Sequence, residues 1–130
     1  MIDSGTLFSI VFFGLLILTA FYIVLWHILH FILCKKYDDI LFREPIFNRM
    51  ELAIYNSWPL SLVRSMGYVL LLAAPNFYSA KRRFKGVTID RSNIFLLTLF
   101  CRIFLIVLAL IVLFILFIIL WNIQTYIFYN

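Results

Sequence analysis

Two long apolar stretches, one near each end of the chain, dominate the pattern of hydrophobic and polar positions. The first covers residues 7–33, and a helix of that length is about 40 Å long, more than the roughly 30 Å of a bilayer's hydrocarbon core. The second, residues 103–121, has nineteen consecutive residues without a polar side chain. Each stretch predicts a transmembrane helix. We expect no cleavable signal peptide, because no basic residue precedes the first stretch and no small-residue cleavage site follows it.

Flanking residues set the limits of the predicted spans. Trp26 is typical of a membrane interface, so the hydrocarbon part of the first helix is placed near residues 7–25, and its last turns emerge through Lys36. Arg102 marks the near boundary of the second span. The far boundary is marked by an aromatic belt of Trp121, Tyr126 and Tyr129.

The second long helix is expected to begin before its apolar core. Asp90 and Ser92 are candidate N-caps, so the helix should start near Ser92. The chain then divides into a first transmembrane helix (1–36), a basic helical region (37–91) and a second transmembrane helix (92–130).

A shorter apolar stretch, residues 60–74, raises the question of a third span. Fifteen helical residues reach only about 22 Å, and Pro75 ends the stretch. Arg64 lies inside it, where a charge at mid-bilayer costs at least about 2.5 kcal/mol. Basic residues flank it on both sides, and a span would carry one flank across the membrane. We therefore predict an interfacial helix, with a shallow re-entrant segment as the alternative.

A helical wheel divides this stretch into two sides. The polar side, expected to face water or headgroups, contains Ser61, Arg64, Ser65 and Tyr68. The apolar side, expected to pack against lipid or residues 93–102, contains Leu62, Val63, Met66, Val69, Leu70 and Ala73. Asn56 or Ser57 is the expected cap, with Pro59 in the first turn.

Two further short helices are expected around this stretch. Residues 45–55 place Ile46, Phe47, Met50 and Ile54 on one face, and residues 76–85 end at Gly86, a good helix terminator. The predicted fold class is an all-α integral membrane protein in which two long transmembrane helices flank a basic, amphipathic helical middle region.

Composition and charge agree with a membrane protein and indicate an orientation. Hydrophobic residues make up 65% of the chain and charged residues 13%, against about 45–50% and 25% in soluble domains. All 11 Lys and Arg lie between Lys35 and Arg102. Because positive residues near spans stay on the cytoplasmic side, we predict extracytoplasmic termini and a cytoplasmic middle region. A bacterial inner membrane, or an organellar inner membrane with the middle region in the matrix, fits this pattern, and nucleic acid is not an expected partner.

A cluster of four cations around one Phe follows the short apolar stretch. Near an anionic leaflet each cation contributes about 1 kcal/mol, so the cluster predicts binding to anionic phospholipids. The predicted headgroup-binding residues are Lys81, Arg82, Arg83, Lys85 and Arg64. The residues predicted to pack against lipid or a partner are Leu62, Val63, Met66, Val69 and Leu70.

Candidate chemistry is sparse. His27, His30 and Cys34 share a helix face with spacings that a metal or haem could use, and Cys101 could approach Cys34. We interpret these instead as polar residues at the water boundary, and expect no metal, cofactor or disulfide. No catalytic set is recognisable, so an enzyme is not predicted. The acids within the basic region suggest local ion pairs: Asp38, Asp39, Glu44, Glu51 and Asp90.

The order of features resembles the small bacterial inner-membrane proteins of the universal stress protein B-like family. The resemblance covers roughly residues 40–105 and rests on the Asn-Ser-x-Pro turn at 56–59, the helix after it, the basic stretch 81–85 and Arg102. It implies two terminal spans around a basic cytoplasmic middle and an association with membrane stress, without catalytic residues. This chain is longer and far richer in Phe and Ile.

Three functions follow from these observations. The first is a non-enzymatic accessory subunit that packs against other integral subunits of a larger membrane complex, such as a respiratory one. The second is a stand-alone stress- or lipid-responsive protein of the inner membrane. The third is a redox or metal protein that uses His27, His30 and Cys34.

Overall fold

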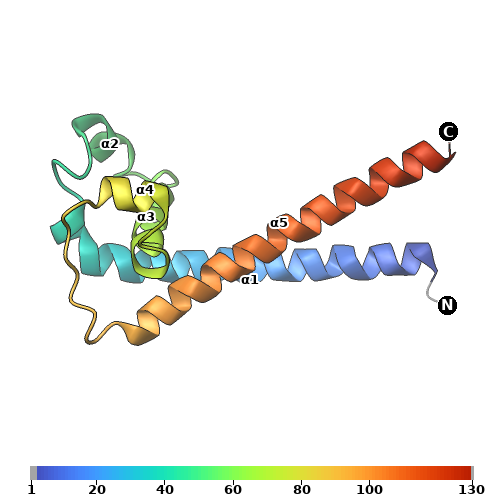
Figure 1. The fold of residues 1–130 in the computed structure, drawn as a ribbon, viewed down its shortest axis with the longest axis horizontal. Coiled ribbons are helices and arrows are strands. Elements are labelled where there is room, and N and C mark those ends of the chain that lie inside the picture. Colours follow the sequence, from blue (N-terminus) through green and yellow to red (C-terminus); the bar gives the residue numbers. More distant parts are fainter. Residues whose placement is uncertain (1–2, 130) are drawn as a thin grey trace.

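The computed structural model describes residues 3–129, which form five helices and no strand (Figure 1). In chain order the helices are α1 (Ser4–Leu41), α2 (Arg49–Ile54), α3 (Ser61–Ala73), α4 (Tyr78–Arg83) and α5 (Phe95–Tyr129). The prediction of an all-helical chain with two long apolar helices is confirmed. α1 and α5 are each long and apolar enough to cross a membrane, whereas α3, with 13 residues, is a shorter apolar helix.

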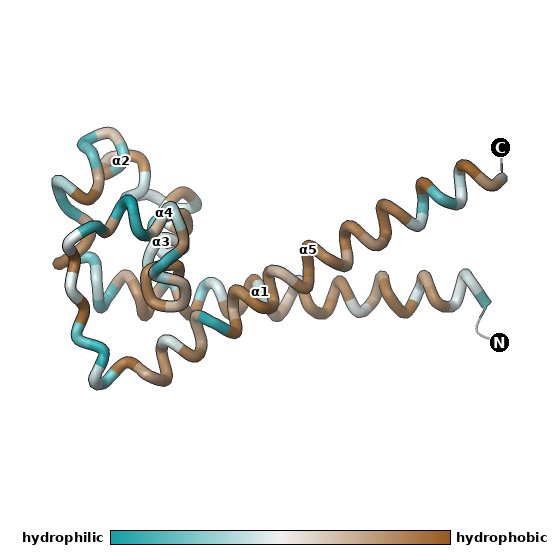
Figure 2. The backbone as a smooth tube through the Cα atoms, in the orientation of Figure 1, coloured by the Kyte–Doolittle hydropathy of each residue, from teal (hydrophilic) through white to brown (hydrophobic). Residues whose placement is uncertain are grey.

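The two long helices cross and then diverge toward the chain termini, which lie at the same end of the molecule (Figure 1). Residues 42–94 form a head at the opposite end, where α3 packs against both α1 and α5, and α4 packs on α3. Hydrophobic positions run along both long helices, while hydrophilic positions gather in the head and its connections (Figure 2). The apolar parts of the long helices and the polar residues of the head thus lie at opposite ends of the molecule.

One face of α1 supplies much of the core because its buried residues recur every three or four positions, the spacing of a helix face. These are Tyr22, Leu25, Leu29, Leu33, Tyr37 and Leu41. At the crossing, the rings of Tyr22 and Phe104 stack with centroids 4.6 Å apart. Cys101, one turn before Phe104, is fully buried. α1 continues to Leu41, so it reaches beyond the predicted boundary at 36 and provides the surface on which α3 rests.

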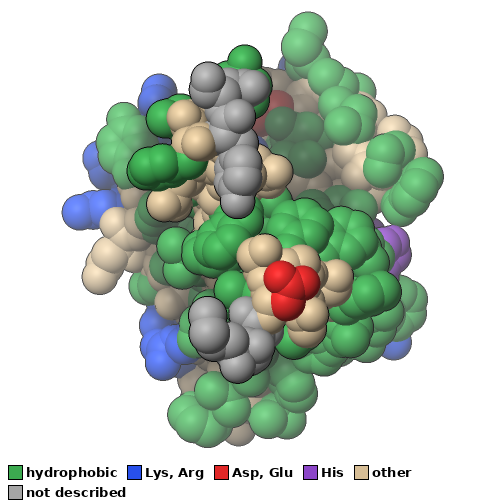
Figure 3. All heavy atoms as spheres, turned by 90° about the vertical axis from the view of Figure 1, so that its right-hand side faces the viewer, with side chains coloured by type: hydrophobic (Ala, Val, Ile, Leu, Met, Phe, Trp, Pro, Cys, Tyr) green, Lys and Arg blue, Asp and Glu red, His purple; other side chains and the backbone are tan. Residues whose placement is uncertain are grey.

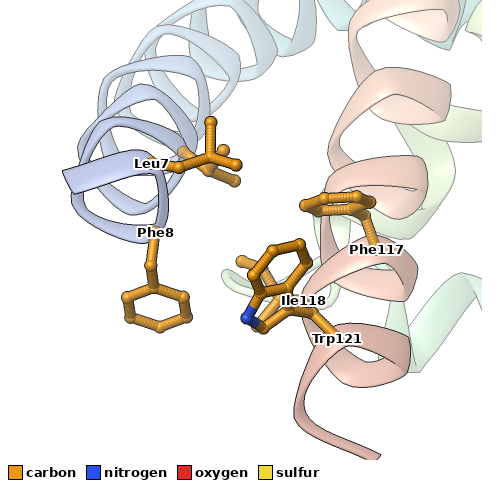
Figure 4. A pocket seen from close by; sticks show the side chains of 6 residues that line it. Leu7, Phe8, Phe117, Ile118 and Trp121 are labelled. Atoms are coloured by element: carbon orange, nitrogen blue, oxygen red, sulfur yellow. The ribbon is translucent and has the colours of Figure 1, made fainter. Parts of the chain in front are cut away.

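Large apolar side chains line the space where the long helices diverge. Phe117, Ile118 and Trp121 of α5 line a small apolar pocket together with Leu7 and Phe8 of α1 (Figure 4). Seen from the terminal end, hydrophobic side chains cover most of the visible surface and Lys and Arg show only toward its rim (Figure 3). The predicted aromatic belt at this end includes Tyr129, whose side chain lies outside the described residues.

The predicted orientation of α3 is wrong for its polar side, which was expected to face water or headgroups. Ser61, Ser65 and Tyr68 of the polar side are buried in the molecule, with Ser65 and Tyr68 fully inaccessible. Val63 of the apolar side is 49% exposed. The helix turns its polar side inward because α1 offers polar partners there, which a wheel drawn from one helix alone does not reveal. Val69 is an exception among the predicted apolar residues, since it is fully buried.

The short helices form where predicted but over fewer residues. α2 begins at Arg49 because Asn48 caps it: the Asn48 side chain accepts the Glu51 N–H at 2.8 Å, and Glu51 accepts the Asn48 N–H at 3.0 Å. Its predicted apolar face is only half right, since Phe47 is buried whereas Met50 and Ile54 are exposed.

The ends of the other helices also differ from expectation. Ser57 does not cap α3 through its side chain, which bonds back to the Ile54 carbonyl. Asp90 accepts the Ser92 N–H at 3.0 Å in a turn, and α5 begins only at Phe95. Gly86 follows α4 with a φ of 82°, a conformation in which glycine avoids the strain of other residues.

Candidate functional site

The most distinctive polar arrangement lies where α3 crosses α1. Arg64 Nη2 lies 3.1 Å from Asp38 Oδ2, and the Tyr68 hydroxyl donates to Asp38 Oδ1 at 2.9 Å. Arg64 Nη2 also lies 3.5 Å from Cys34 Sγ, whose sulfur lies 3.5 Å from His30 Nδ1. We call these five residues the junction cluster. His30, Cys34 and Asp38 follow one another at intervals of four residues on α1, and they meet Arg64 and Tyr68 of α3.

Burial gives this cluster its energetic weight. The Arg64 side chain is 8% exposed and that of Asp38 29%. An arginine removed from water is strongly destabilising unless a carboxylate compensates it, and Asp38 supplies that charge. The guanidinium also lies over the Phe42 ring, 4.2 Å from its centroid, and this cation–π contact covers a group whose Nε has no hydrogen-bond partner. Burial, and then the bond to Asp38, raise the pKa of Tyr68, so its hydroxyl keeps its proton.

The contacts of this arrangement connect two helices rather than prepare a reactive group. Its charges cancel, and each carboxylate oxygen of Asp38 is engaged by a different residue of α3. The bidentate use of Asp38 fixes both the position of α3 along α1 and its rotation about its own axis. We therefore interpret the cluster as the element that holds the head on the long helices.

The proposed metal ligands do not converge. His27 is exposed and its Nδ1 donates to the Ile23 carbonyl at 2.8 Å, while His30 contacts Cys34. Within residues 3–129 no three His, Cys, Asp or Glu side chains group as metal ligands would. Cys34 and Cys101 are both free thiols.

A second long-range ion pair ties α2 to α4. Arg83 Nη2 lies 2.8 Å from Glu51 Oε1, and its guanidinium lies over the Phe47 ring at 4.7 Å. The hydrogen bond from the Asn48 N–H, together with Arg83, lowers the pKa of Glu51. Of the ion pairs that the described residues form, only that between Glu44 and Arg49 is local, so the expectation of local pairing holds for one of three.

The structure separates the residues predicted to bind headgroups. Arg64 lies in the interior, and Arg83 is paired with Glu51, whereas Lys81, Arg82 and Lys85 are exposed. Phe84, the aromatic residue of the cluster, is buried against Tyr68 and Phe47, so it anchors α4. Headgroup binding by the exposed cations stays a prediction.

The residues predicted to pack against lipid or a partner are placed as follows. Val63 is exposed, and Leu62, Met66 and Leu70 are half-buried. Val69 faces the core. A contact with lipid or with a partner is thus open to four of the five.

The sequence indicated several of the charged residues of these contacts but not the residues with which they interact. Asn48 and Glu51 form a capping box, which their spacing of three residues indicates. Asp38 and Tyr68 carried no comparable signal, because Asp38 is 26 positions from Arg64 in the sequence. The only clue was Arg64 itself, a cation in an apolar helix that requires a carboxylate somewhere nearby.

Comparison with known proteins adds no relative: no family model, curated protein or solved structure matches this chain. The resemblance to the universal stress protein B-like family stays a prediction.

Proposed function

We propose that this chain is a two-pass membrane protein whose long helices pack against other integral subunits of a larger membrane complex, such as a respiratory one. Its role is non-enzymatic, and its head covers a seam on the cytoplasmic or matrix side. Both termini lie on the opposite side. Anionic phospholipids contact the basic head, and no cofactor is required.

The surface of the long helices carries this proposal. Large apolar side chains are exposed along α1 and α5, and several polar groups among them bond within their own helix. Thr19 donates to the Leu15 carbonyl and Thr125 to the Trp121 carbonyl, both at 2.8 Å. A surface with its polar groups satisfied in this way suits contact with hydrocarbon or with apolar helices.

The head supplies the reason to favour a protein partner over lipid alone. Trp58, Phe77 and Tyr78 are 71%, 58% and 76% exposed. Exposed aromatic side chains of this kind are enriched where proteins meet, because they bury a large area at a low cost in conformational entropy.

Extraction in a mild detergent followed by native mass spectrometry tests the proposal. We expect a stoichiometric assembly much heavier than the 15.4 kDa chain. A photo-crosslinking amino acid at Trp58 should capture a membrane subunit of that assembly, whereas the same group at Arg49, whose side chain is 92% exposed, should not. A chain that is recovered alone, with crosslinks only to lipid, would refute the subunit role.

The second candidate is a stand-alone stress- or lipid-responsive protein of the inner membrane. The observation that favours it is a set of exposed cations on the head, including Lys81 and Lys85, that form no ion pair within residues 3–129. It predicts the opposite result in the same experiment, a single chain whose abundance or conformation follows the lipid composition of the membrane.

A further inference from the structure

A groove on the head is lined by cations from both sides of Gly86. It has a volume of about 420 Å³ and lies between the end of α3, α4 and the segment that follows Gly86. Lys81, Lys85 and Arg91 line it. Ligand pockets commonly measure about 300–1,000 Å³, so the groove is large enough for a small organic molecule.

Backbone geometry creates this groove. The positive φ of Gly86, 82°, reverses the chain after α4, and the Val87 N–H donates to the Phe84 carbonyl at 3.0 Å. Residues 87–91 then lead from α4 toward α5, and Val87, Ile89 and Arg91 of this segment line the groove together with the two lysines. Arg91 was not among the cations that the sequence assigned to headgroups.

The positive charge of the basic groove, as we call this site, is uncompensated. Among residues 3–129, none of its three cations lies within ion-pair distance of a carboxylate. Asp90, the acid next to Arg91 in sequence, accepts the Ser92 N–H instead and does not line the groove. Three like charges around one hollow repel one another, and a bound anion would relieve that repulsion.

The lining is also partly apolar. Leu71 and Phe84 line the groove on the core side, and Val87 and Ile89 line it from the segment that follows Gly86. A ligand that fits must therefore combine a concentrated negative charge with a less polar portion.

We propose that the basic groove binds the phosphate monoester of an organic phosphate, either a phospholipid headgroup or a soluble phosphate ester. A phosphate monoester carries close to two negative charges, and its oxygens accept charge-assisted hydrogen bonds from Arg and Lys, with the planar guanidinium of Arg91 able to engage two of them. The carbon portion contacts the apolar lining. This site is distinct from general attraction to an anionic surface, which every exposed cation would share.

The lipid source is tested with the full chain in nanodiscs. Phosphatidic acid, a monoester, is compared with phosphatidylglycerol, a diester, at equal total surface charge in phosphatidylcholine, and retained lipids are counted by native mass spectrometry. We expect phosphatidic acid to be retained at least fivefold over the diester. This arm rests on the proposed membrane insertion.

The soluble source is tested in a neutral detergent, which requires no assumption about insertion. Phenyl phosphate, a soluble monoester with an apolar portion, is titrated by calorimetry, with phenol as the uncharged control. Saturable binding of the phosphate alone would assign the groove to a soluble ester, and its absence together with retained phosphatidic acid would assign it to the headgroup.

Matched variants locate the site. Lys85→Gln with Arg91→Gln removes two groove cations, and Lys35→Gln with Arg43→Gln removes one Lys and one Arg that are also exposed but lie elsewhere. Thermal unfolding confirms that each variant is folded. We expect the groove pair to weaken phosphate binding at least tenfold and the control pair less than twofold. Equal losses in the two pairs, or no preference for a monoester in either arm, would overturn the proposal.

Discussion

Arg64 shows how a cation can be kept inside an apolar helical protein. Its guanidinium forms an ion pair with Asp38 and lies over the ring of Phe42, and both residues belong to the C-terminal end of α1 or follow it directly. These contacts come from a segment far away in the chain, so Arg64 can be buried only after α3 has docked. The residue therefore makes the docked position more specific than apolar contacts alone would, since apolar surfaces tolerate sliding.

Asp38→Asn should destabilise the head by about 3 kcal/mol, because it leaves Arg64 buried without a counter-charge. Asp39→Asn is the control, since Asp39 is the next residue along and is exposed. Thermal unfolding in detergent, followed by circular dichroism, measures both. If the two variants unfold at the same temperature, Asp38 does not hold Arg64 in the way described.

An apolar replacement of the whole joint separates stability from specificity. Asp38→Leu, Arg64→Met and Tyr68→Phe together remove the ion pair and the tyrosine hydrogen bond at once, so no buried charge is left unpaired, and most of the stability lost in Asp38→Asn should return. A triple variant that is less stable than Asp38→Asn would contradict this reasoning.

Ser65→Asp should be far more damaging than Val63→Asp. Ser65 is fully buried and donates to the Leu62 carbonyl at 2.8 Å, so an aspartate there places an unpaired carboxylate in the interior. Val63 is 49% exposed, and its aspartate variant should fold in detergent. Limited proteolysis of the head distinguishes them: cleavage should accelerate at least tenfold for Ser65→Asp and less than twofold for Val63→Asp. The reverse order would restore the orientation that the sequence predicted.

Among the helices, α2 depends on pH through Glu51. Its pKa is lowered from the ordinary 4.5 by the hydrogen bond from Asn48 and by Arg83. A carboxylate with a lowered folded-state pKa stabilises the fold above its unfolded pKa, and this contribution is lost as pH falls through the folded value. The contact between α2 and α4 should therefore loosen below about pH 4.5, which hydrogen exchange at the backbone amides of both helices can measure.

The control for this effect is another glutamate of the head. Glu51→Gln should remove much of the acid-dependent loosening, while Glu44→Gln, which affects only the exposed pair with Arg49, should leave it intact. Loosening that persists unchanged in Glu51→Gln would assign the pH dependence to other groups.

Helices were easier to predict from this sequence than their contacts. The length of an apolar stretch identifies α1 and α5, and Pro75 and Gly86 mark where α3 and α4 end, because these signals act within one helix. The orientation of α3 depends on Asp38, a residue of another helix, so its wheel alone pointed the wrong way. The same holds for Arg91, which lines the basic groove through the course of the chain after Gly86, and no signal within one helix indicates that course.

For the whole molecule, the proposed topology predicts which positions a membrane-impermeant reagent can label in intact cells. In a variant with Cys34 and Cys101 replaced by Ser and Ala, single cysteines at Ser4 and Gln124 should react with a membrane-impermeant maleimide from outside. A cysteine at Ser79, in the head, should react only after permeabilisation. Labelling at Ser4 that also requires permeabilisation would invert the proposed topology.

The confinement of the cations also has a consequence for the membrane voltage. The segment from Lys35 to Arg102 holds all 11 cations and five of the six acids, so it carries a formal charge of +6. Each elementary charge moved across a membrane works against about 2.3 kcal/mol per 100 mV. In the proposed topology, moving this segment across an energised membrane would cost about 14 kcal/mol per 100 mV of electrical work. In that topology, a voltage that is negative on the side of the head would hold the protein in the orientation acquired at insertion.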